Sequence, residues 1–199
     1  MPSPAASPFD RLAAEPGAVR LAVRGVPVIV HNTRPDVSTE QALARLGEAL
    51  DLIARYSPGR FRRLQRDLAG IWVQRFACRG AYFPAERACL TELTFLVHPE
   101  ITAAQVAASI LHEATHARVA QSAVGSCANR AAREERICRR VELEFGRAVP
   151  GGEQVVTRAL ESLTLADVEV APAIDWTEAE RRVSQVDRAT ESERSRPER

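Results

Sequence analysis

Residues 101–120 form the segment that most constrains the fold of this chain. It is the most apolar stretch of the sequence, and it is interrupted by Gln105, His112, Glu113 and Arg118. A bilayer would penalise these polar side chains heavily, so the segment predicts a buried helix of a soluble protein and no membrane span. Because nearly all of its other residues are apolar or small, such a helix should be covered on most sides by protein.

The polar residues of this predicted helix share one side of it. At helical period they fall within about 100° of arc, and they are Gln105, Ser109, His112, Glu113 and His116. A thin polar stripe on a buried helix must face a partner, a cavity or an ion, because unpaired buried polar groups are costly. The alternative is a pair of core histidines in a salt bridge with Glu113, which the extent of the stripe disfavours.

His112 and His116 lie one helical turn apart on the same face, since four residues separate them. Two imidazoles in this arrangement can bind a single zinc ion. Glu113 lies beside that position without reaching it, where a carboxylate can take a proton from the water that the ion activates. The motif His112-Glu113-Ala114-Thr115-His116 therefore predicts one Zn²⁺, two histidine ligands and a general base, Glu113.

The third zinc ligand should come from the next helix, because catalytic zinc usually has three protein ligands. Gly125 breaks the first helix, and a second one is predicted over residues 129–146. If the two helices form an antiparallel hairpin, Glu134 and Glu135 come level with the histidines. Helical phase places Glu134 within the stripe expected to face the first helix and Glu135 at its edge. That stripe consists of Cys127, Ala131, Cys138, Val141 and Phe145.

Hydrophobic patterning elsewhere predicts an α+β fold with a small antiparallel sheet packed on these two helices. Strand-like runs lie at residues 19–30, 71–76, 81–83 and 89–97. Helices are expected at 39–56 (capped by Ser38 or Thr39), 58–68, 153–163 and 176–187. The domain then spans 19–165, after a disordered segment at 1–18 and before a loosely held helix and charged tail at 166–199.

Composition limits the kinds of partner that the chain is expected to bind and the cellular compartment in which it is expected to occur. A formal net charge of +1 offers no global field for nucleic acid or anionic lipid, and the arginines at 60, 62, 63 and 66 indicate a solvated face. Residues 1–18 contain no apolar run, so neither a signal peptide nor a membrane anchor is expected there. Cys78, Cys89, Cys127 and Cys138 form no CxxC pair, which favours reduced thiols and a cytoplasmic location. The oligomeric state stays open.

The chain resembles the gluzincin metallopeptidases, in which HExxH is followed by a glutamate on a second helix. The segments AYFP (81–84), ILHEATHAR (110–118) and ERICRRVELEF (135–145) are similar to an uncharacterised bacterial family of zincin-like proteins. The resemblance covers residues 40–155. It implies a minimal zincin core and Glu135 as the third ligand, and on this basis Glu135 is preferred to Glu134.

The sequence also departs from the gluzincin pattern. Arg139 stands where many relatives have an Asp that orients a zinc-bound His, so Glu142 or Glu92 is the candidate for that role. Relatives use a downstream His or Tyr to stabilise the oxyanion, and this chain has neither after His116. Tyr82 or an arginine such as Arg133 is then the candidate.

These patterns together predict a zinc-dependent hydrolase that acts on a peptide or protein substrate. An exposed strand beside the active helix would hold the substrate, and residues 89–97 are the candidate strand. The alternative is a metal-stabilised module that binds a protein partner without catalysis. A structural zinc site needs no general base, so the presence of Glu113 favours the enzyme.

Overall fold

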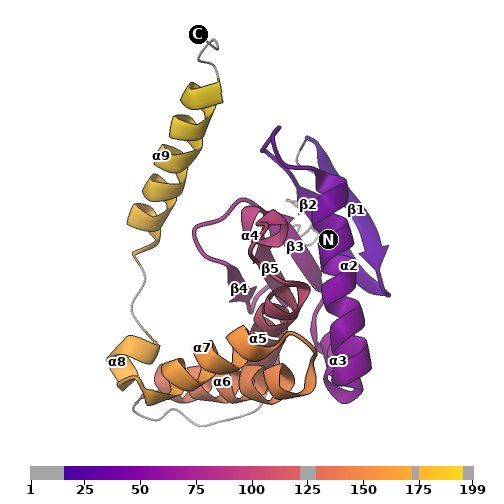
Figure 1. The fold of residues 1–199 in the computed structure, drawn as a ribbon, viewed down its shortest axis with the longest axis vertical. Coiled ribbons are helices and arrows are strands. Elements are labelled where there is room, and N and C mark those ends of the chain that lie inside the picture. The colour runs from indigo at the N-terminus through magenta and orange to yellow at the C-terminus, as the bar shows by residue number, and fades with distance from the viewer. Residues whose placement is uncertain (1–15, 122–128, 172–174, 195–199) are drawn as a thin grey trace, which may run out of the picture.

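The computed structural model describes residues 16–121, 129–171 and 175–194. Within them a five-stranded sheet is combined with helices, which confirms the α+β class. Figure 1 shows the sheet beside α2 (Thr39–Tyr56) and α3 (Pro58–Asp67), with α6 (Arg130–Ala148) and α7 (Glu153–Thr164) below it. Among the described helices, none has the length and apolarity needed to cross a membrane.

The sheet has the order β1-β2-β3-β5-β4 and is mixed, so the prediction of an antiparallel sheet is wrong. β1 (Ala18–Val23) and β2 (Val26–His31) form a hairpin, but β2 pairs with β3 (Gly70–Gln74) in parallel. The reason is the connection between β2 and β3. It contains α2 and α3, and a helical crossover of this length returns the chain in the same direction.

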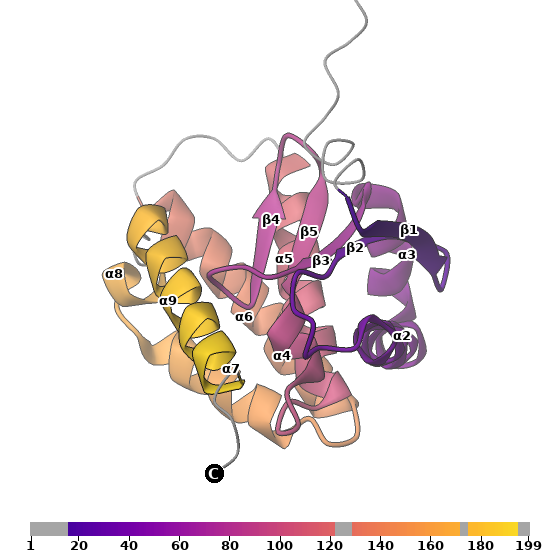
Figure 2. The same ribbon diagram turned by 90° about the horizontal axis from the view of Figure 1, so that it is seen from above.

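β5 (Ala88–Glu92) is an interior strand, parallel to β3 and antiparallel to β4 (Gly80–Phe83). The run at 89–97 is therefore neither an edge strand nor a single strand. It ends at Glu92, whose carboxylate accepts a hydrogen bond of 2.7 Å from the Phe95 amide and so caps the short helix α4 (Leu93–Val97). β4 is the strand at this edge of the sheet, and it contacts the helix that carries the histidines (Figure 2).

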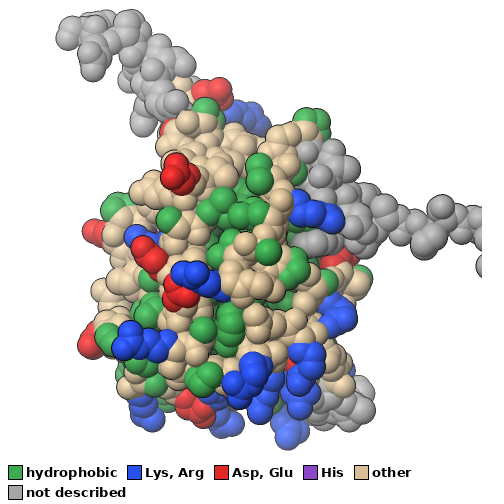
Figure 3. All heavy atoms as spheres, turned by 90° about the vertical axis from the view of Figure 1, so that its right-hand side faces the viewer, with side chains coloured by type: hydrophobic (Ala, Val, Ile, Leu, Met, Phe, Trp, Pro, Cys, Tyr) green, Lys and Arg blue, Asp and Glu red, His purple; other side chains and the backbone are tan. Residues whose placement is uncertain are grey.

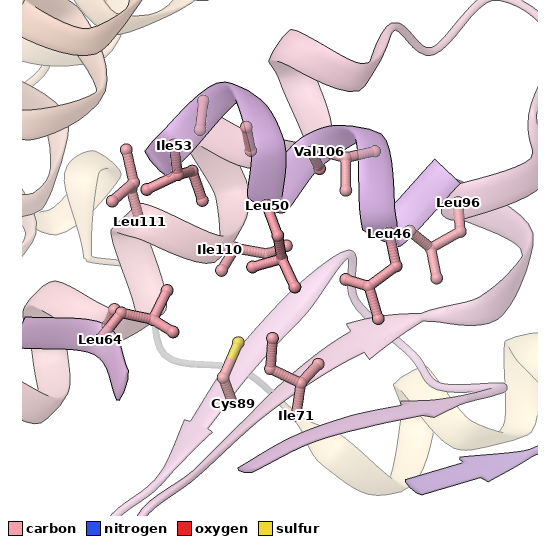
Figure 4. Packing of buried hydrophobic residues seen from close by; sticks show 14 of the residues in the cluster. Leu46, Leu50, Ile53, Leu64, Ile71, Cys89, Leu96, Val106, Ile110 and Leu111 are labelled. Carbon is pink, nitrogen blue, oxygen red and sulfur yellow. The ribbon is translucent and has the colours of Figure 1, made fainter. Parts of the chain in front are cut away.

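The main core lies between the helices and one face of the sheet. α2 and α5 (Ala103–Gln121) cross above the strands, and their apolar side chains point toward Ile71 and Cys89 (Figure 4). These side chains are fully buried, and each is expected to contribute ~1.5–3 kcal/mol to stability; they include Leu46, Leu50, Ile53, Ile110 and Leu111. A smaller cluster around Trp72 and Leu90 forms the second core group.

α5 ends at Gln121, and α6 (Arg130–Ala148) packs along it, as the predicted hairpin requires. α7 (Glu153–Thr164) then packs closely on α6. At Gly152 the two backbones almost touch, because a β carbon added there would lie 2.1 Å from the carbonyl oxygen of Gly146. Only glycine fits this turn without a clash, so the turn fixes how closely the ends of α6 and α7 approach each other.

The C-terminal part contains α8 (Asp167–Val170) and α9 (Trp176–Arg194). α9 extends beyond residue 187, where the predicted helix ended, so the chain after residue 189 is helical as far as Arg194. Asp187 attaches α9 to the body through ion pairs of 2.6 Å with Arg34 and 3.0 Å with Arg75. The segment at 1–15, predicted to be disordered, lies outside the described residues.

Arginine side chains gather at the lower end of the face in Figure 3, where α3 lies in Figure 1. α3 contributes four of them, at positions 60, 62, 63 and 66. Arg60 forms an ion pair with Glu144 and Arg66 with Asp67. Half of this cluster is thus neutralised within the protein, which fits a solvated face.

Candidate metal centre

His112 and His116 project from the same face of α5 toward α6. Their Nε2 atoms lie 3.2 Å apart, and their ring centroids are separated by 5.0 Å. His112 is buried, with 6% of its surface exposed, and His116 is partly buried. Two imidazoles that turn the same nitrogen toward one point in a covered site form two corners of a metal site.

Glu135 of α6 supplies the third corner. Its Oε2 lies 3.2 Å from Nε2 of His112, and its Oε1 lies 3.1 Å from Nε2 of His116. Burial raises the pKa of Glu135, but hydrogen bonds to both histidines outweigh that effect and keep the pKa well below its usual range. The carboxylate is therefore ionised and ready to bind a cation.

The spacing of these three groups fits a zinc ion. Zinc bonds of ~2.0–2.1 Å at tetrahedral angles place two ligand atoms ~3.3 Å apart. The two Nε2 atoms are 3.2 Å apart, and each lies 3.1 to 3.2 Å from one of the two carboxylate oxygens of Glu135, which is close to that value. Two neutral nitrogens and one carboxylate are also a ligand set that zinc accepts, so the donors and their spacing both suit the ion.

Glu134 points elsewhere: it forms an ion pair of 2.6 Å with Arg130. The helical phase that favoured Glu134 requires Ala131 to lie on the face of α6 that contacts α5. In the structure Ala131 is exposed and Ala132 is buried, so the contact face of α6 is centred one position later. That shift brings Glu135 to the histidines.

Cys138, one turn beyond Glu135, is a fourth potential ligand. One atom from each of His112, His116 and Cys138 lies within 4.8 Å of the other two, so this group can hold a metal ion. Burial and the charge of Glu135 raise the pKa of the thiol, which is therefore protonated at neutral pH. Glu135, whose ionised carboxylate has oxygens 3.2 and 3.1 Å from the two histidine nitrogens, is the better candidate for the third ligand. Sequence reasoning assigned Cys138 to the core, although its spacing from Glu135 was a signal for this role.

Glu142 lies behind His112, with Oε1 3.2 Å from Nδ1. The contact is at ion-pair distance and is not a well-directed hydrogen bond. Glu142 is buried and is itself held by Arg139 at 2.9 Å. Burial lowers the pKa of His112, but its contacts with Glu135 and Glu142 outweigh this and raise the pKa to about 9. A proton on Nδ1 leaves Nε2 free for a metal.

Glu92, the other acid considered for this role, belongs to a separate network. It forms an ion pair of 2.9 Å with Arg75 and accepts a hydrogen bond of 2.6 Å from Thr94. Of the two acids, Glu142 is thus the one that lies beside His112.

Glu113 lies between α5 and β4, and 8% of its surface is exposed. β4 approaches it very closely, since a β carbon at Gly80 would lie 3.0 Å from its Oε1. Burial is the largest influence on the carboxyl group, and it raises its pKa. No ion pair or hydrogen bond of this carboxylate occurs within the described part of the chain. It is a buried, unpaired base with a raised affinity for a proton.

One cavity of about 690 Å³, a volume typical of small-ligand sites, is lined by His112, Glu113, His116, Glu135 and Glu142. Tyr82 of β4 lies on its wall, whereas Arg133 is exposed and is not among the lining residues. Burial raises the pKa of the Tyr82 hydroxyl, which remains a proton donor at neutral pH. Of the two oxyanion candidates, only Tyr82 is near the histidines.

The two remaining histidines have ordinary structural roles. Nδ1 of His98 accepts a hydrogen bond of 3.2 Å from the Glu100 amide in a turn, and His31 ends β2. Cys78 and Cys89 are free thiols, as expected. Cys127 lies outside the described residues.

Comparisons with known protein families, with curated proteins and with solved structures find no match for this chain.

Proposed function

We propose that this protein is a zinc-dependent hydrolase that cleaves peptide bonds. One observation carries the proposal: the Nε2 atoms of His112 and His116 lie 3.2 Å apart, and each lies 3.1 to 3.2 Å from an oxygen of the Glu135 carboxylate, beside the unpaired carboxylate of Glu113. A structural metal site has no use for such a base. An open cavity in front of these groups provides room for a substrate.

In this proposal His112, His116 and Glu135 hold the zinc ion. When bound, the ion supplies Lewis-acid chemistry, which polarises a carbonyl and lowers the pKa of water. Glu142 keeps a proton on Nδ1 of His112 and so fixes the orientation of the ring. Arg139 holds Glu142 in place from the other side.

Glu113 acts as general base and then as general acid. It accepts a proton from the attacking water, and its raised pKa supports that step. It then donates the proton to the nitrogen of the leaving amine. Tyr82 donates a hydrogen bond to the developing oxyanion from the wall formed by β4.

The fold supports a zincin-like reading of this site. α5 carries the HExxH motif, α6 carries the glutamate, and the edge strand β4 lies along α5. Because β4 is at the edge of the sheet and lines the cavity, it is the strand along which a peptide can lie in extended form.

Metal analysis of matched variants tests the ligand set. Glu135→Gln should lose most of the bound zinc, whereas Glu134→Gln, which alters the neighbouring glutamate, should retain it. Cys138→Ser should also retain zinc, and the cobalt-substituted protein should show no thiolate charge-transfer absorption. A purified protein without zinc, even after reconstitution, would overturn the assignment.

Hydrolysis of a peptide library tests the chemistry. The unaltered protein should cleave members of the library, and Glu113→Gln should hold zinc but lose cleavage. If both proteins bind zinc and neither cleaves any peptide, the site is a metal-stabilised binding module instead.

A further inference from the structure

One end of the cavity is formed by three arginines from different elements. Arg79 precedes β4, Arg139 lies on α6 and Arg158 on α7, and all three are lining residues. α6 and α7 pack side by side (Figure 1), which places Arg158 next to Arg139. The three charges are close enough to interact. Arg158 is exposed over part of its surface, and desolvation of the remainder lowers the pKa of its guanidinium group. Glu142 opposes that effect, and the positive charges of Arg139 and Arg79 add to it.

Only one of these arginines has an acidic partner within the described residues. Arg139 is paired with Glu142. Arg79 stacks on the ring of Phe95, at 5.6 Å from its centroid, and forms no ion pair there. The guanidinium group of Arg158 forms neither an ion pair nor a hydrogen bond with any part of the chain that is described. The donors of the Arg158 guanidinium are therefore available at the cavity wall, and Arg79, which lies between this cavity and a second one that contains Phe95, adds an unpaired charge beside it.

The acids of the cavity do not offset these two charges. Glu134 is neutralised by Arg130 at 2.6 Å, and Glu135 is held by the two histidines. Glu113 is the remaining unpaired acid of the wall, and in the proposed mechanism it becomes protonated during the reaction. The zinc ion would add further positive charge.

An excess of positive charge in a concave site selects an anionic ligand, because guanidinium groups bind carboxylates through paired, charge-assisted hydrogen bonds. Like charges that gather on a cavity wall repel one another, and a bound anion relieves that repulsion. A peptide has two sources of such an anion: its C-terminal carboxylate and its acidic side chains.

We propose that Arg158 and Arg79 form a subsite for a carboxylate of the substrate, so that the protein acts on peptides with a free carboxylate near the scissile bond. This inference rests on the proposed function, since it assigns a substrate class to the same cavity. Arg139 serves as a positioning residue here, because its donors already hold Glu142.

Peptide binding to zinc-loaded protein carrying Glu113→Gln tests the subsite without turnover. Four fluorescent peptides that differ only at the C-terminus provide the probes. The last residue is either Glu or Gln, and the terminus is either a free carboxylate or an amide. At least one peptide with a carboxylate should bind about tenfold more tightly than the neutral amide, as expected for a charged hydrogen bond. The free acid with Gln isolates the terminal carboxylate, and the amide with Glu isolates the side chain.

Arg158→Gln should abolish the preference for the carboxylate and leave the affinity for the neutral amide unchanged. Arg79→Gln should reduce the preference. Arg140→Gln is the matched control, since Arg140 is an exposed arginine of α6 that does not line the cavity. Equal affinities for all four peptides, absence of binding, or a preference that persists in Arg158→Gln would each overturn the inference.

Cleavage of the neutral amide by protein with Glu113 intact separates this inference from the proposed function. If the amide is cleaved but no peptide with a carboxylate is preferred, the subsite is wrong and the peptidase stands. If a carboxylate is preferred but nothing is cleaved, the subsite stands and the peptidase is wrong.

Discussion

Gly80→Ala is the sharpest test of how β4 and α5 fit together. The added methyl group would lie 3.0 Å from Oε1 of Glu113 and 3.1 Å from Oγ of Ser109. Ordinary contacts begin at 3.4 Å, so the carboxylate has to move by about 0.4 Å. Glu113 is buried and cannot swing freely into solvent.

The expected result is a loss of peptidase activity without loss of zinc. A displacement of 1 Å can cost about a hundredfold in rate, so a shift of about 0.4 Å should lower kcat/KM by about five- to tenfold. The assay is hydrolysis of a peptide selected from the library, together with zinc content and melting temperature. Glu113 does not ligate the metal in this proposal, so zinc content should stay constant.

Gly59→Ala is the matched control, because no atom lies within 4 Å of a β carbon at Gly59. That variant should keep its activity. Full activity in Gly80→Ala would refute the reasoning, since it would mean that Glu113 need not keep its position against β4. A parallel loss of zinc and activity would refute it too, by showing that the substitution disturbs the ligands.

Three further results follow from the structure. Gly152→Ala should lower the melting temperature by about 5 °C, since its β carbon would lie 2.1 Å from the carbonyl oxygen of Gly146; calorimetry showing an unchanged transition would contradict this. Zinc affinity should rise about tenfold per pH unit from about pH 6 to about 9. The pKa of about 9 for His112 means that the ion must displace a proton, which is harder at low pH; titrations that give one Kd at every pH would disprove it. Glu142→Gln should weaken zinc binding by about ten- to a hundredfold, because it removes the acid 3.2 Å from Nδ1 of His112; competition with a chelating dye measures the change, and an unaltered Kd would count against this role.

The helices that build the site were predictable because their periodicity is local information. α5 and α6 begin and end within a few residues of the predicted positions. Four of the five residues in the polar stripe of α5 line the cavity, whereas Gln105 exchanges hydrogen bonds with Thr102 at the start of the helix. A 3.6-residue repeat reports which side of a helix is buried, whatever covers it.

The sheet was less predictable, because strand order depends on contacts between distant segments. The parallel pairing of β2 with β3 follows from the two helices between them, which was a usable signal. The end of β5 was harder to see. Residues 93–97 are apolar and partly β-branched, as in a strand, but the capping carboxylate of Glu92 starts a helix there. The hydrogen bond from the Phe95 amide to the Glu92 carboxylate outweighed the strand propensity of these residues.

The choice between Glu134 and Glu135 shows how far a single helical phase can be trusted. Adjacent residues differ by about 100° around the axis, so an error of one position in the assumed contact face exchanges the two. The phase had included Ala131, which is exposed. The buried residues Cys138, Glu142 and Phe145 define the true face, and Glu135 continues it toward the N-terminus at helical spacing.

That same face explains why several charged groups can be buried together on α6. Glu135 and Glu142 follow one another at two-turn spacing, and both contact His112, one at each ring nitrogen. Without the histidine the two carboxylates would be buried like charges, which is costly. With His112 in place, each carboxylate has a positive or metal-binding partner, and Arg139 further neutralises Glu142. The ion pairs of α6 therefore support the candidate metal site from outside. Glu113 has no such partner among the described residues, which is why the proposed mechanism assigns proton transfer to it.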